Sequence, residues 1–258
     1  MKVTVDVESI ANKQPEYYAP FDLVIATDLD FNTLSMVDAS TRIQQKPFYA
    51  AGAHGFYGYI FADLIEHTYV IEREKSNRPT ALVAESATRK VVASQTKKEN
   101  GKNIEMVTKQ EMYTPLLLAN SSPLAPEYLN NRRKLRRVTP LVSCLRALWE
   151  FQRSGTGRML PSTSTPADLQ LFTTLATSQH KELQLPMETL TSEFLRSFLQ
   201  NLGSELAPVT AFLGGQLAQD VINVLGKREQ PIQNLLLFDG EEMKAPVYAL
   251  HPIFADGM

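Results

Sequence analysis

The sequence predicts an α/β fold in which a mixed sheet carries a helical insertion. Three observations support this. Residues 21–29 (FDLVIATDL) form an apolar run without alternation, which is typical of a strand covered on both faces, and a helical spacing follows over residues 30–45. Glycines interrupt the apolar stretch 47–64, which predicts two consecutive strands with bends. Three helical patterns then occupy residues 126–203. A chain of 258 residues is long enough for one large domain or two small ones.

The first part of the chain has α/β character and then becomes antiparallel. Residues 2–7 (KVTVDV) alternate apolar and polar side chains, which predicts a first strand. The strand at 21–29 precedes the helix, for which Asp30 or Asn32 is a suitable N-cap. After the two strands within 47–64, alternation at 67–73 predicts a further strand.

The remaining elements are helices and terminal strands. Residues 76–103 are polar and irregular, which predicts a loop, and residues 104–113 return as a strand. Pro140 is expected to kink or split the first predicted helix, because proline removes a hydrogen-bond donor and clashes with the preceding turn. The sequence predicts helices at 126–153, 166–183, 187–202 and 207–225, and strands at 234–240 and 245–250 around a DGEEMK turn.

Composition excludes several classes of protein. The net charge is −2 and the pI about 6.1, so nothing global favours nucleic acid or a membrane surface as partner. Cys144 is the single cysteine, which rules out a disulfide within the chain and fits a reducing compartment. The first ten residues contain no apolar signal region, and no stretch is long and apolar enough to cross a membrane. These features predict a soluble protein of the cytosol or nucleus.

A glycine pair lies within the pattern of the last helix. A phosphate loop needs glycines between a strand and a helix start, so that backbone N–H groups point at the anion. Gly214 and Gly215 instead lie inside an apolar helical pattern, and no Lys-Ser or Lys-Thr pair follows them. We therefore predict that they permit close packing, with contact to a ligand as the alternative.

At 3.6 residues per turn, Gly214 and Gly215 lie on a helix face made almost entirely of alanine and glycine. Such a face lets another helix or strand approach closely. Each mid-helix glycine costs up to ~1 kcal/mol relative to alanine, so a close contact should offset the loss. We predict that the face is a docking surface, composed of Ala207, Ala211, Gly214, Gly215, Ala218 and Ile222.

The chemical candidates do not make a complete catalytic site. No G-x-G-x-x-G motif occurs. Asp28 and Asp30 follow a predicted strand, where α/β sheets place functional groups, and two carboxylates there could hold Mg²⁺. The favoured interpretation of these two aspartates is a helix cap and a solvated loop. Cys144 lies in an apolar helical pattern without a nearby histidine, which predicts a buried structural thiol. None of the four histidines, His54, His67, His180 and His251, has metal-ligand spacing to another ligand.

The segment 131–137 (NRRKLRR) is the one basic cluster, with Arg132 and Arg137 at the ends of its cationic run. A solvated helix face is the simplest interpretation. A nuclear import signal or a site for an acidic partner is the functional alternative.

Several segments, in the same order, resemble the family of smaller subunits of SUMO-activating enzymes, above all the fungal forms. Residues 21–34 (FDLVIATDLDFNTL) resemble the strand–turn–helix of an adenylation-type Rossmann half. Residues 47–72 resemble that family's glycine- and aromatic-rich segment, which ends in a pattern matched by Phe61, Asp63, Leu64 and His67. Residues 205–240, which contain the glycine pair, carry the strongest likeness.

This resemblance implies a ThiF/MoeB-like adenylation fold and a pseudo-symmetric heterodimer with a larger catalytic subunit. The larger subunit would hold ATP and Mg²⁺, the thioester cysteine and the structural zinc, while this chain would bind no cofactor and would meet SUMO only indirectly. The Gly214/Gly215 helix would lie near the pseudo-twofold interface. The implied location is the nucleus, and also the cytoplasm.

Two departures from the family pattern carry further expectations. Active subunits place an asparagine and an aspartate at the strand end, where this chain has Ala26 and Leu29, with Asp28 and Asp30 off register. The expected result is a degenerate pseudo-site. The family's N-terminal helix, first strand and glycine turn have no counterpart here. The chain is therefore expected to express poorly alone and to lack the arginine that reaches the partner's ATP.

The likeness divides the chain into four expected segments. Residues 1–75 would be the C-terminal part of a Rossmann-like half, 76–125 a loop and strand connection, 126–203 the helical insertion, and 204–258 the interface helix and terminal strands. Three alternatives remain: a small subunit for another modifier of the NEDD8 type, the inactive half of a fused ubiquitin-activating enzyme, or a free-standing Rossmann-type nucleotide-binding enzyme.

Overall fold

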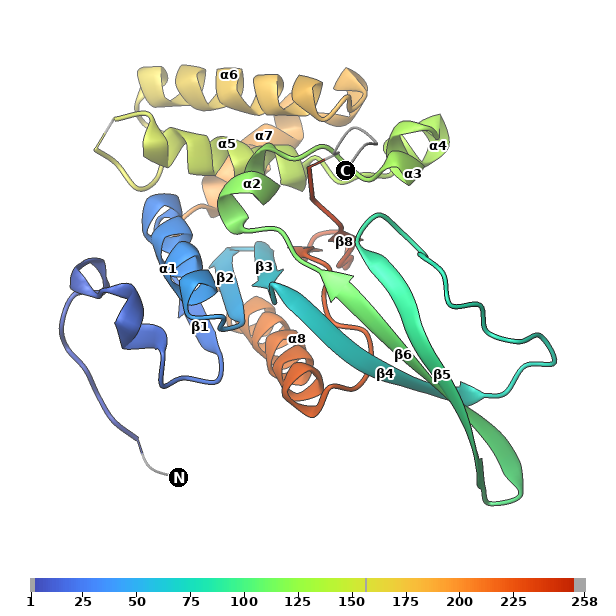
Figure 1. Ribbon diagram of the computed structural model, residues 1–258. Coiled ribbons are helices and arrows are strands. Elements are labelled where there is room, and N and C mark those ends of the chain that lie inside the picture. Colours follow the sequence, from blue (N-terminus) through green and yellow to red (C-terminus); the bar gives the residue numbers. More distant parts are fainter. Residues whose placement is uncertain (1–2, 156, 253–258) are drawn as a thin grey trace.

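A five-stranded mixed sheet forms the centre of the computed structural model, which describes residues 3–155 and 157–252 (Figure 1). The first two strands are parallel, and every other neighbouring pair is antiparallel. This mixed sheet with helices confirms the predicted α/β class. In spatial order the strands are β1 (Val24–Thr27), β2 (Phe48–His54), β3 (Tyr57–Asp63), β7 (Leu235–Asp239) and β8 (Val247–Tyr248).

The parallel pair is joined by helix α1 (Phe31–Ile43), as the sequence predicts. The carboxylate of Asp30 caps this helix by accepting hydrogen bonds from the backbone N–H groups of Asn32 and Thr33, at 3.0 and 3.1 Å. The strand predicted at residues 2–7 is wrong over the described part of that range. Val3, Val5 and Val7 are exposed and pair with no strand, so their alternation has no sheet to face.

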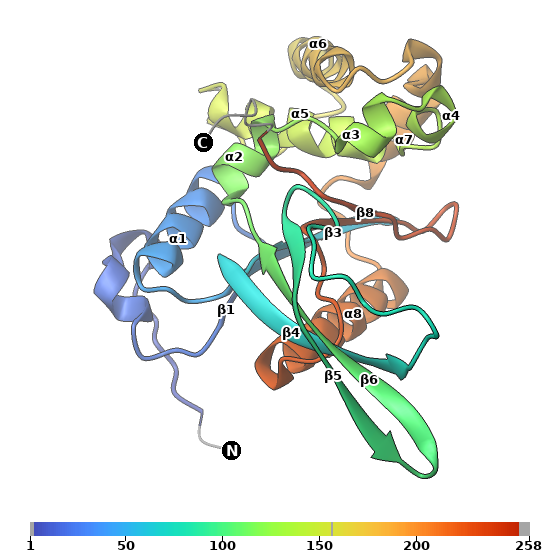
Figure 2. The ribbon, with the colours of Figure 1, turned by 45° about the vertical axis from the view of Figure 1, so that its right-hand side comes forward.

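A second sheet of three antiparallel strands extends from the body (Figure 2). It consists of β4 (Glu66–Glu74), β6 (Lys102–Met112) and β5 (Arg89–Glu99), in that order. The predicted loop at 76–103 is therefore wrong over β5. The hydropathy pattern did not predict β5 because polar contacts to β6 stabilise it. Glu105 of β6 accepts hydrogen bonds from Ser94 of β5 and Arg73 of β4, and Glu111 of β6 pairs with Arg89 of β5.

The helical insertion contains more pieces than the sequence predicts. The predicted helix 126–153 is split as expected, but into three helices: α4 ends at Leu135, and Pro140 is the N-cap residue of α5, which begins at Leu141. Helix α2 was not predicted. The third predicted helix, 187–202, begins as a 3₁₀ turn. The helices are α2 (Leu116–Ser121), α3 (Pro126–Leu129), α4 (Arg132–Leu135), α5 (Leu141–Arg153), α6 (Pro166–Glu182) and α7 (Ser192–Asn201), with 3₁₀ turns at Ile10–Asn12, Pro15–Tyr18 and Met187–Thr189.

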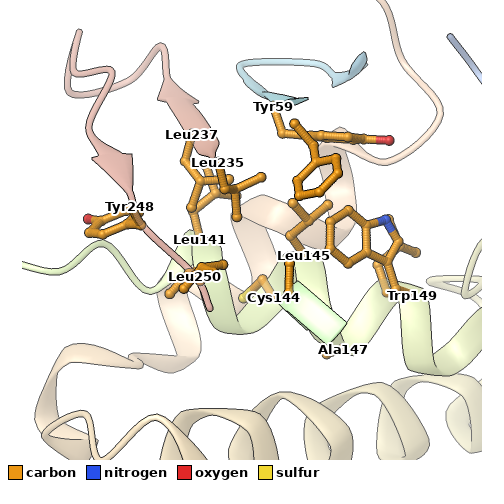
Figure 3. Close-up of a cluster of buried hydrophobic side chains, with 14 of the residues drawn as sticks. Tyr59, Leu141, Cys144, Leu145, Ala147, Trp149, Leu235, Leu237, Tyr248 and Leu250 are labelled. Atoms are coloured by element: carbon orange, nitrogen blue, oxygen red, sulfur yellow. The ribbon is translucent and has the colours of Figure 1, made fainter. Parts of the chain in front are cut away.

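Two hydrophobic cores cover opposite faces of the central sheet. Because side chains alternate along a strand, Leu235 and Leu237 face α5, whereas Leu236 and Phe238 face the last helix, α8 (Ala207–Gly226). Figure 3 shows the first core, in which Leu235 and Leu237 of β7 lie above α5 and Cys144 of that helix lies beside Leu250. Helix α8 therefore covers one face of the sheet, while α1 and the helical insertion cover the other (Figure 1).

Candidate partner interface and strand-end pocket

Helix α8 has one face that is fully engaged inside the chain. Val209, Leu213, Leu217 and Val224 are buried against the sheet. Asp220 lies on the same face, where it accepts hydrogen bonds from the Tyr49 hydroxyl at 2.6 Å and from the Ile232 backbone N–H. Burial raises the pKa of Asp220, although these two hydrogen bonds oppose the shift. This face fixes the helix to β2 and β3.

The other face contains the six residues predicted from the sequence as a docking surface, five of them alanine or glycine, and all six are exposed. A Cβ atom added at Gly214 or Gly215 would meet nothing within 4 Å among the described residues. Ile222, the one large side chain of the set, is 64% exposed. The structure thus brings the six residues together on one surface, and no described part of this chain makes the close approach that the small side chains would permit.

The glycine pair lies in the interior of α8, two turns after its start at Ala207. Helix N–H groups beyond the first four donate to carbonyl groups within the helix, so the N–H groups of Gly214 and Gly215 do not point at an external anion. Their position supports the packing interpretation over a phosphate loop.

A pocket of about 450 Å³ opens beside this face, at the carboxyl ends of β1 and β2. Its walls include Tyr59 from β3, Leu148 and Trp149 from α5, and Leu213 from α8. Gly214 also lines it, so the pocket and the small-residue face of α8 share an edge. In open α/β sheets this is the end at which ligands bind.

The predicted pseudo-site residues divide between the pocket and its surroundings. Ala26 is buried in β1, while Asp28 and Leu29 line the pocket. Burial alone would raise the pKa of Asp30, but hydrogen bonds from Thr33 and Asn32 outweigh it, and its pKa lies below the ordinary value. Asp30 is thus committed to capping α1, which supports the cap interpretation for this residue.

Asp28 has a different environment. Its φ is +56°, a left-handed conformation that aspartate tolerates better than most residues. Its carboxylate is exposed and makes no hydrogen bond or ion pair with the described part of the chain. Among the described residues, no group of three or more His, Cys, Asp or Glu side chains is arranged to hold a metal ion.

His54, at the end of β2, was not selected by the sequence reasoning as a site residue. Its Nδ1 is buried and has no hydrogen-bond partner among the described residues. Burial lowers the pKa of His54 to about 4, even though Asp28 acts in the opposite direction, so the imidazole is neutral at pH 7. The carboxyl end of the second parallel strand is a usual place for functional groups, and that rule would have found this residue.

Tyr59 and Trp149 were also missed, because aromatic residues in apolar segments resemble ordinary core. Both are nearly fully buried, and their rings meet edge to face with centroids 5.5 Å apart. Figure 3 shows the Tyr59 hydroxyl and the Trp149 indole nitrogen on the same side of this cluster. The pocket therefore has two aromatic residues in its walls, each with a polar atom.

The charge of the pocket lining is one-sided. Its acidic members are Asp28 and Glu205, and no lysine or arginine belongs to the lining that the structure describes. A triphosphate needs cationic side chains or helix N-terminal N–H groups to offset its charge. This lining supplies no such cations.

Other chemical candidates lie away from the pocket. Cys144 is completely buried, and burial raises the pKa of its thiol, as expected of a structural cysteine. His180 is buried and makes a 2.9 Å hydrogen bond with Ser143 Oγ, whereas His67 stacks on Tyr69. These groups have structural neighbours and no approach to a common site.

The basic cluster forms the short helix α4 and the residues after it. Asn131 caps the helix, Leu135 is buried, and the five cationic side chains between Arg132 and Arg137 are exposed. Lys134 lies 3.7 Å from Glu127, and Arg136 lies 3.6 Å from Glu188. An import signal or an acidic partner stays a prediction for this surface.

Comparison with known proteins gives relatives that span almost the whole chain. A protein of Saccharomyces cerevisiae named DNA damage tolerance protein RHC31 is 29% identical over 251 residues, which cover 96% of this chain and 70% of that protein. SUMO-activating enzyme subunit 1 of Rattus norvegicus is 29% identical over 252 residues, covering 97% and 68%. DNA damage tolerance protein rad31 of Schizosaccharomyces pombe is 25% identical over 250 residues, covering 97% and 67%. No family model matches the sequence. In the described part of the chain, no helix combines the length and hydropathy needed to cross a bilayer.

Proposed function

Since the chain belongs to the family of smaller subunits of SUMO-activating enzymes, we propose that it is the non-catalytic partner in such a heterodimer. It supports the ATP-dependent adenylation of SUMO and the thioester transfer that follow on a larger subunit. ATP and Mg²⁺ are bound by that subunit, and this chain contributes the surface on which it assembles.

The observation that carries this proposal is the exposed face of α8. A helix that is apolar on all sides is normally buried. One side of α8 is buried by the central sheet, while a Cβ atom added at Gly214 or Gly215 on the other side would meet no described atom within 4 Å. Alanine and glycine allow the backbone of a partner element to come close, which increases the packed area per residue. The larger subunit is the occupant that the family provides.

The chemistry of the chain supports the division of labour. Its single thiol, Cys144, is buried and held protonated, so it cannot take a thioester. The strand-end pocket has an acidic lining, which repels a nucleotide triphosphate. Both reactive functions are therefore assigned to the larger subunit.

The alternative functions have less support. Relatives of this chain carry the name of SUMO-activating enzyme subunits, which favours SUMO over a NEDD8-type modifier. A free-standing Rossmann-type enzyme would need a glycine-rich phosphate turn, and the sequence contains no G-x-G-x-x-G motif.

Co-expression with the cognate larger subunit tests the proposal. We expect a one-to-one complex in size-exclusion chromatography with light scattering. We also expect ATP–pyrophosphate exchange by this complex to be stimulated by SUMO more than by NEDD8. The isolated chain should show no binding of ATP in calorimetry. Tight ATP binding by the chain alone, or no complex with the larger subunit, would contradict the proposal.

We propose the nucleus as the main location, with the exposed cations of α4 as the import signal. A fluorescent fusion of the full chain tests this. Replacing Arg132, Arg133 and Arg137 by alanine should shift fluorescence toward the cytoplasm. An unchanged distribution would assign the cluster to another role.

A further inference from the structure

The strand-end pocket has a composition that the proposed division of labour does not explain. It is large enough for a long side chain, and two carboxylates, Asp28 and Glu205, belong to its lining. Neither carboxylate makes a hydrogen bond or an ion pair with any described residue. Two unpaired carboxylates in a described lining without lysine or arginine favour a cationic occupant, because each carboxylate gains a charge-assisted hydrogen bond from it.

The imidazole of His54 in the pocket lining is also compatible with a cationic occupant. The buried Nδ1 of His54 has no partner among the described residues. A neutral imidazole has one ring nitrogen that can accept a hydrogen bond, so His54 can receive an N–H from a cation without repelling it. Asp28 belongs to the same lining as His54 and Tyr59, and its charge acts to raise the pKa of both side chains.

The walls suit an occupant with an apolar stem and a flat cationic head. Trp149 is 3% exposed and Tyr59 is 5% exposed, and both rings line the pocket with Leu148 and Leu160. Aromatic rings attract cations, and apolar walls pack against a methylene chain. A guanidinium group carries five donors in a plane and so can bind more than one acceptor, whereas an ammonium group carries three donors.

Continuity with α8 indicates where the cation comes from. Thr210 and Gly214 belong to both α8 and the pocket lining, and Gly214 is part of the proposed docking face. A polypeptide that packs on this face passes the mouth of the pocket. We propose that the pocket receives an arginine side chain of the larger subunit, so that it anchors the heterodimer at the end of the sheet. This inference rests on the proposed function, and it assigns a recognition role to the degenerate nucleotide end.

The first test uses the complex of the full chain with its larger subunit. The double variant Asp28→Asn with Glu205→Gln removes both charges and preserves shape, and asparagine also tolerates the left-handed backbone at position 28. We expect the dissociation constant to rise about tenfold at low salt, with a smaller difference at 0.5 M salt because exposed charges are screened. The control, Asp22→Asn with Glu193→Gln, changes the net charge equally at exposed positions outside the pocket lining and should leave affinity unchanged.

The second test identifies the occupant. A photo-crosslinking amino acid at Thr27, an exposed member of the pocket lining, should capture a peptide of the larger subunit that contains an arginine. The same amino acid at Thr174, an exposed residue of α6, is the control position. Unchanged affinity of the pocket variant, or a captured peptide without arginine, would overturn the inference and leave the proposed function standing. Failure of the wild-type chain to bind the larger subunit would overturn both.

Discussion

The two faces of α8 differ in what completes them. On one face, leucine and valine side chains such as Leu213 and Leu217 fill the space above the central sheet, and the Tyr49–Asp220 hydrogen bond fixes the register of the helix. On the other face, the small residues are exposed and leave space above the helix, namely Ala207, Ala211, Gly214, Gly215 and Ala218. The first face is completed by this chain, and the second requires another molecule.

This difference shows that side-chain size, rather than hydropathy, separates a core face from a docking face on the same helix. Both faces are apolar, so a hydropathy profile treats α8 as uniformly buried. A face of large residues makes its contacts at ordinary interhelical distance, whereas a face of alanine and glycine makes them only when a partner backbone comes close. The following variants separate the two roles.

The largest effect is expected from bulky residues on the exposed face. Gly214→Leu with Gly215→Leu should weaken binding of the larger subunit at least about 100-fold, because two isobutyl groups would prevent the close approach of the partner. The isolated chain should keep its fold, because an added Cβ at either position meets no neighbour within 4 Å. The dissociation constant and the circular dichroism spectrum of the variant measure the two outcomes.

A matched control lies on the same helix. Gln216→Leu adds a comparable apolar surface at an exposed position directed away from the docking face, and it should leave the affinity within a factor of two or so of wild type. Loss of binding by this control, or retained binding by the glycine variant, would remove the distinction between the two faces.

A smaller effect is expected on the buried face, and it should appear in stability rather than assembly. Leu217→Ala should lower the free energy of unfolding of the chain by about 2–3 kcal/mol. The lower part of the usual range applies because Leu217 already borders the strand-end pocket, so fewer contacts are lost. Urea unfolding followed by circular dichroism provides the measurement. A loss below about 0.5 kcal/mol would show that α8 is held to the sheet mainly by other residues.

A smaller effect is expected on the pH dependence of the free energy of unfolding. Because burial raises the pKa of Asp220 above its value in the unfolded chain, the folded protein binds this proton more tightly. Its contribution to stability is complete below about pH 4 and decreases as the pH rises through the folded-state pKa. Asp220→Asn should therefore reduce the downward slope of stability with rising pH, by at most about 1.4 kcal/mol per pH unit.

The difference between the variant and wild type isolates Asp220. The pKa of Asp38 is also raised, by burial and by the nearby Asp63 carboxylate. Asp38 is present in both wild type and Asp220→Asn, so its contribution to the pH dependence of unfolding cancels in the comparison. Equal slopes of unfolding free energy between pH 4 and 8 would show that Asp220 does not titrate differently on folding.

The sequence predicted the elements whose patterns are local. The β1–α1–β2 unit, the strand pair around Gly55 and the break at Pro140 follow from apolar runs, glycine placement and the missing proline N–H. The sequence prediction was wrong where pairing with a neighbouring strand decides whether a segment becomes a strand. Residues 3–7 alternate but have no partner strand, whereas β5 is polar and is a strand because β6 lies beside it.

The candidate site was predictable in part for the same reason. Helical periodicity placed Gly214 and Ala218 on one face without any knowledge of the tertiary fold. The pocket could not be found in this way, because His54, Trp149 and Glu205 come from segments far apart in the sequence and meet only in the folded chain. Helical periodicity in the sequence therefore predicts which residues share a helix face, whereas a cavity is defined only by the tertiary packing.

The smallest expected effect compares a glycine on the docking face with one beneath the buried face. Gly214→Ala should raise the free energy of unfolding of the isolated chain by up to about 1 kcal/mol, because alanine is the better helix former and its Cβ enters open space. Differential scanning calorimetry should show a rise of about 2–4 °C. Gly58→Ala should act in the opposite direction, because its Cβ would lie 2.3 Å from Leu213 Cδ1 on the buried face of α8. The same substitution would then stabilise the chain where α8 faces solvent and destabilise it where α8 meets the sheet. Two shifts of the same sign would show that the exposed face is already in contact within this chain.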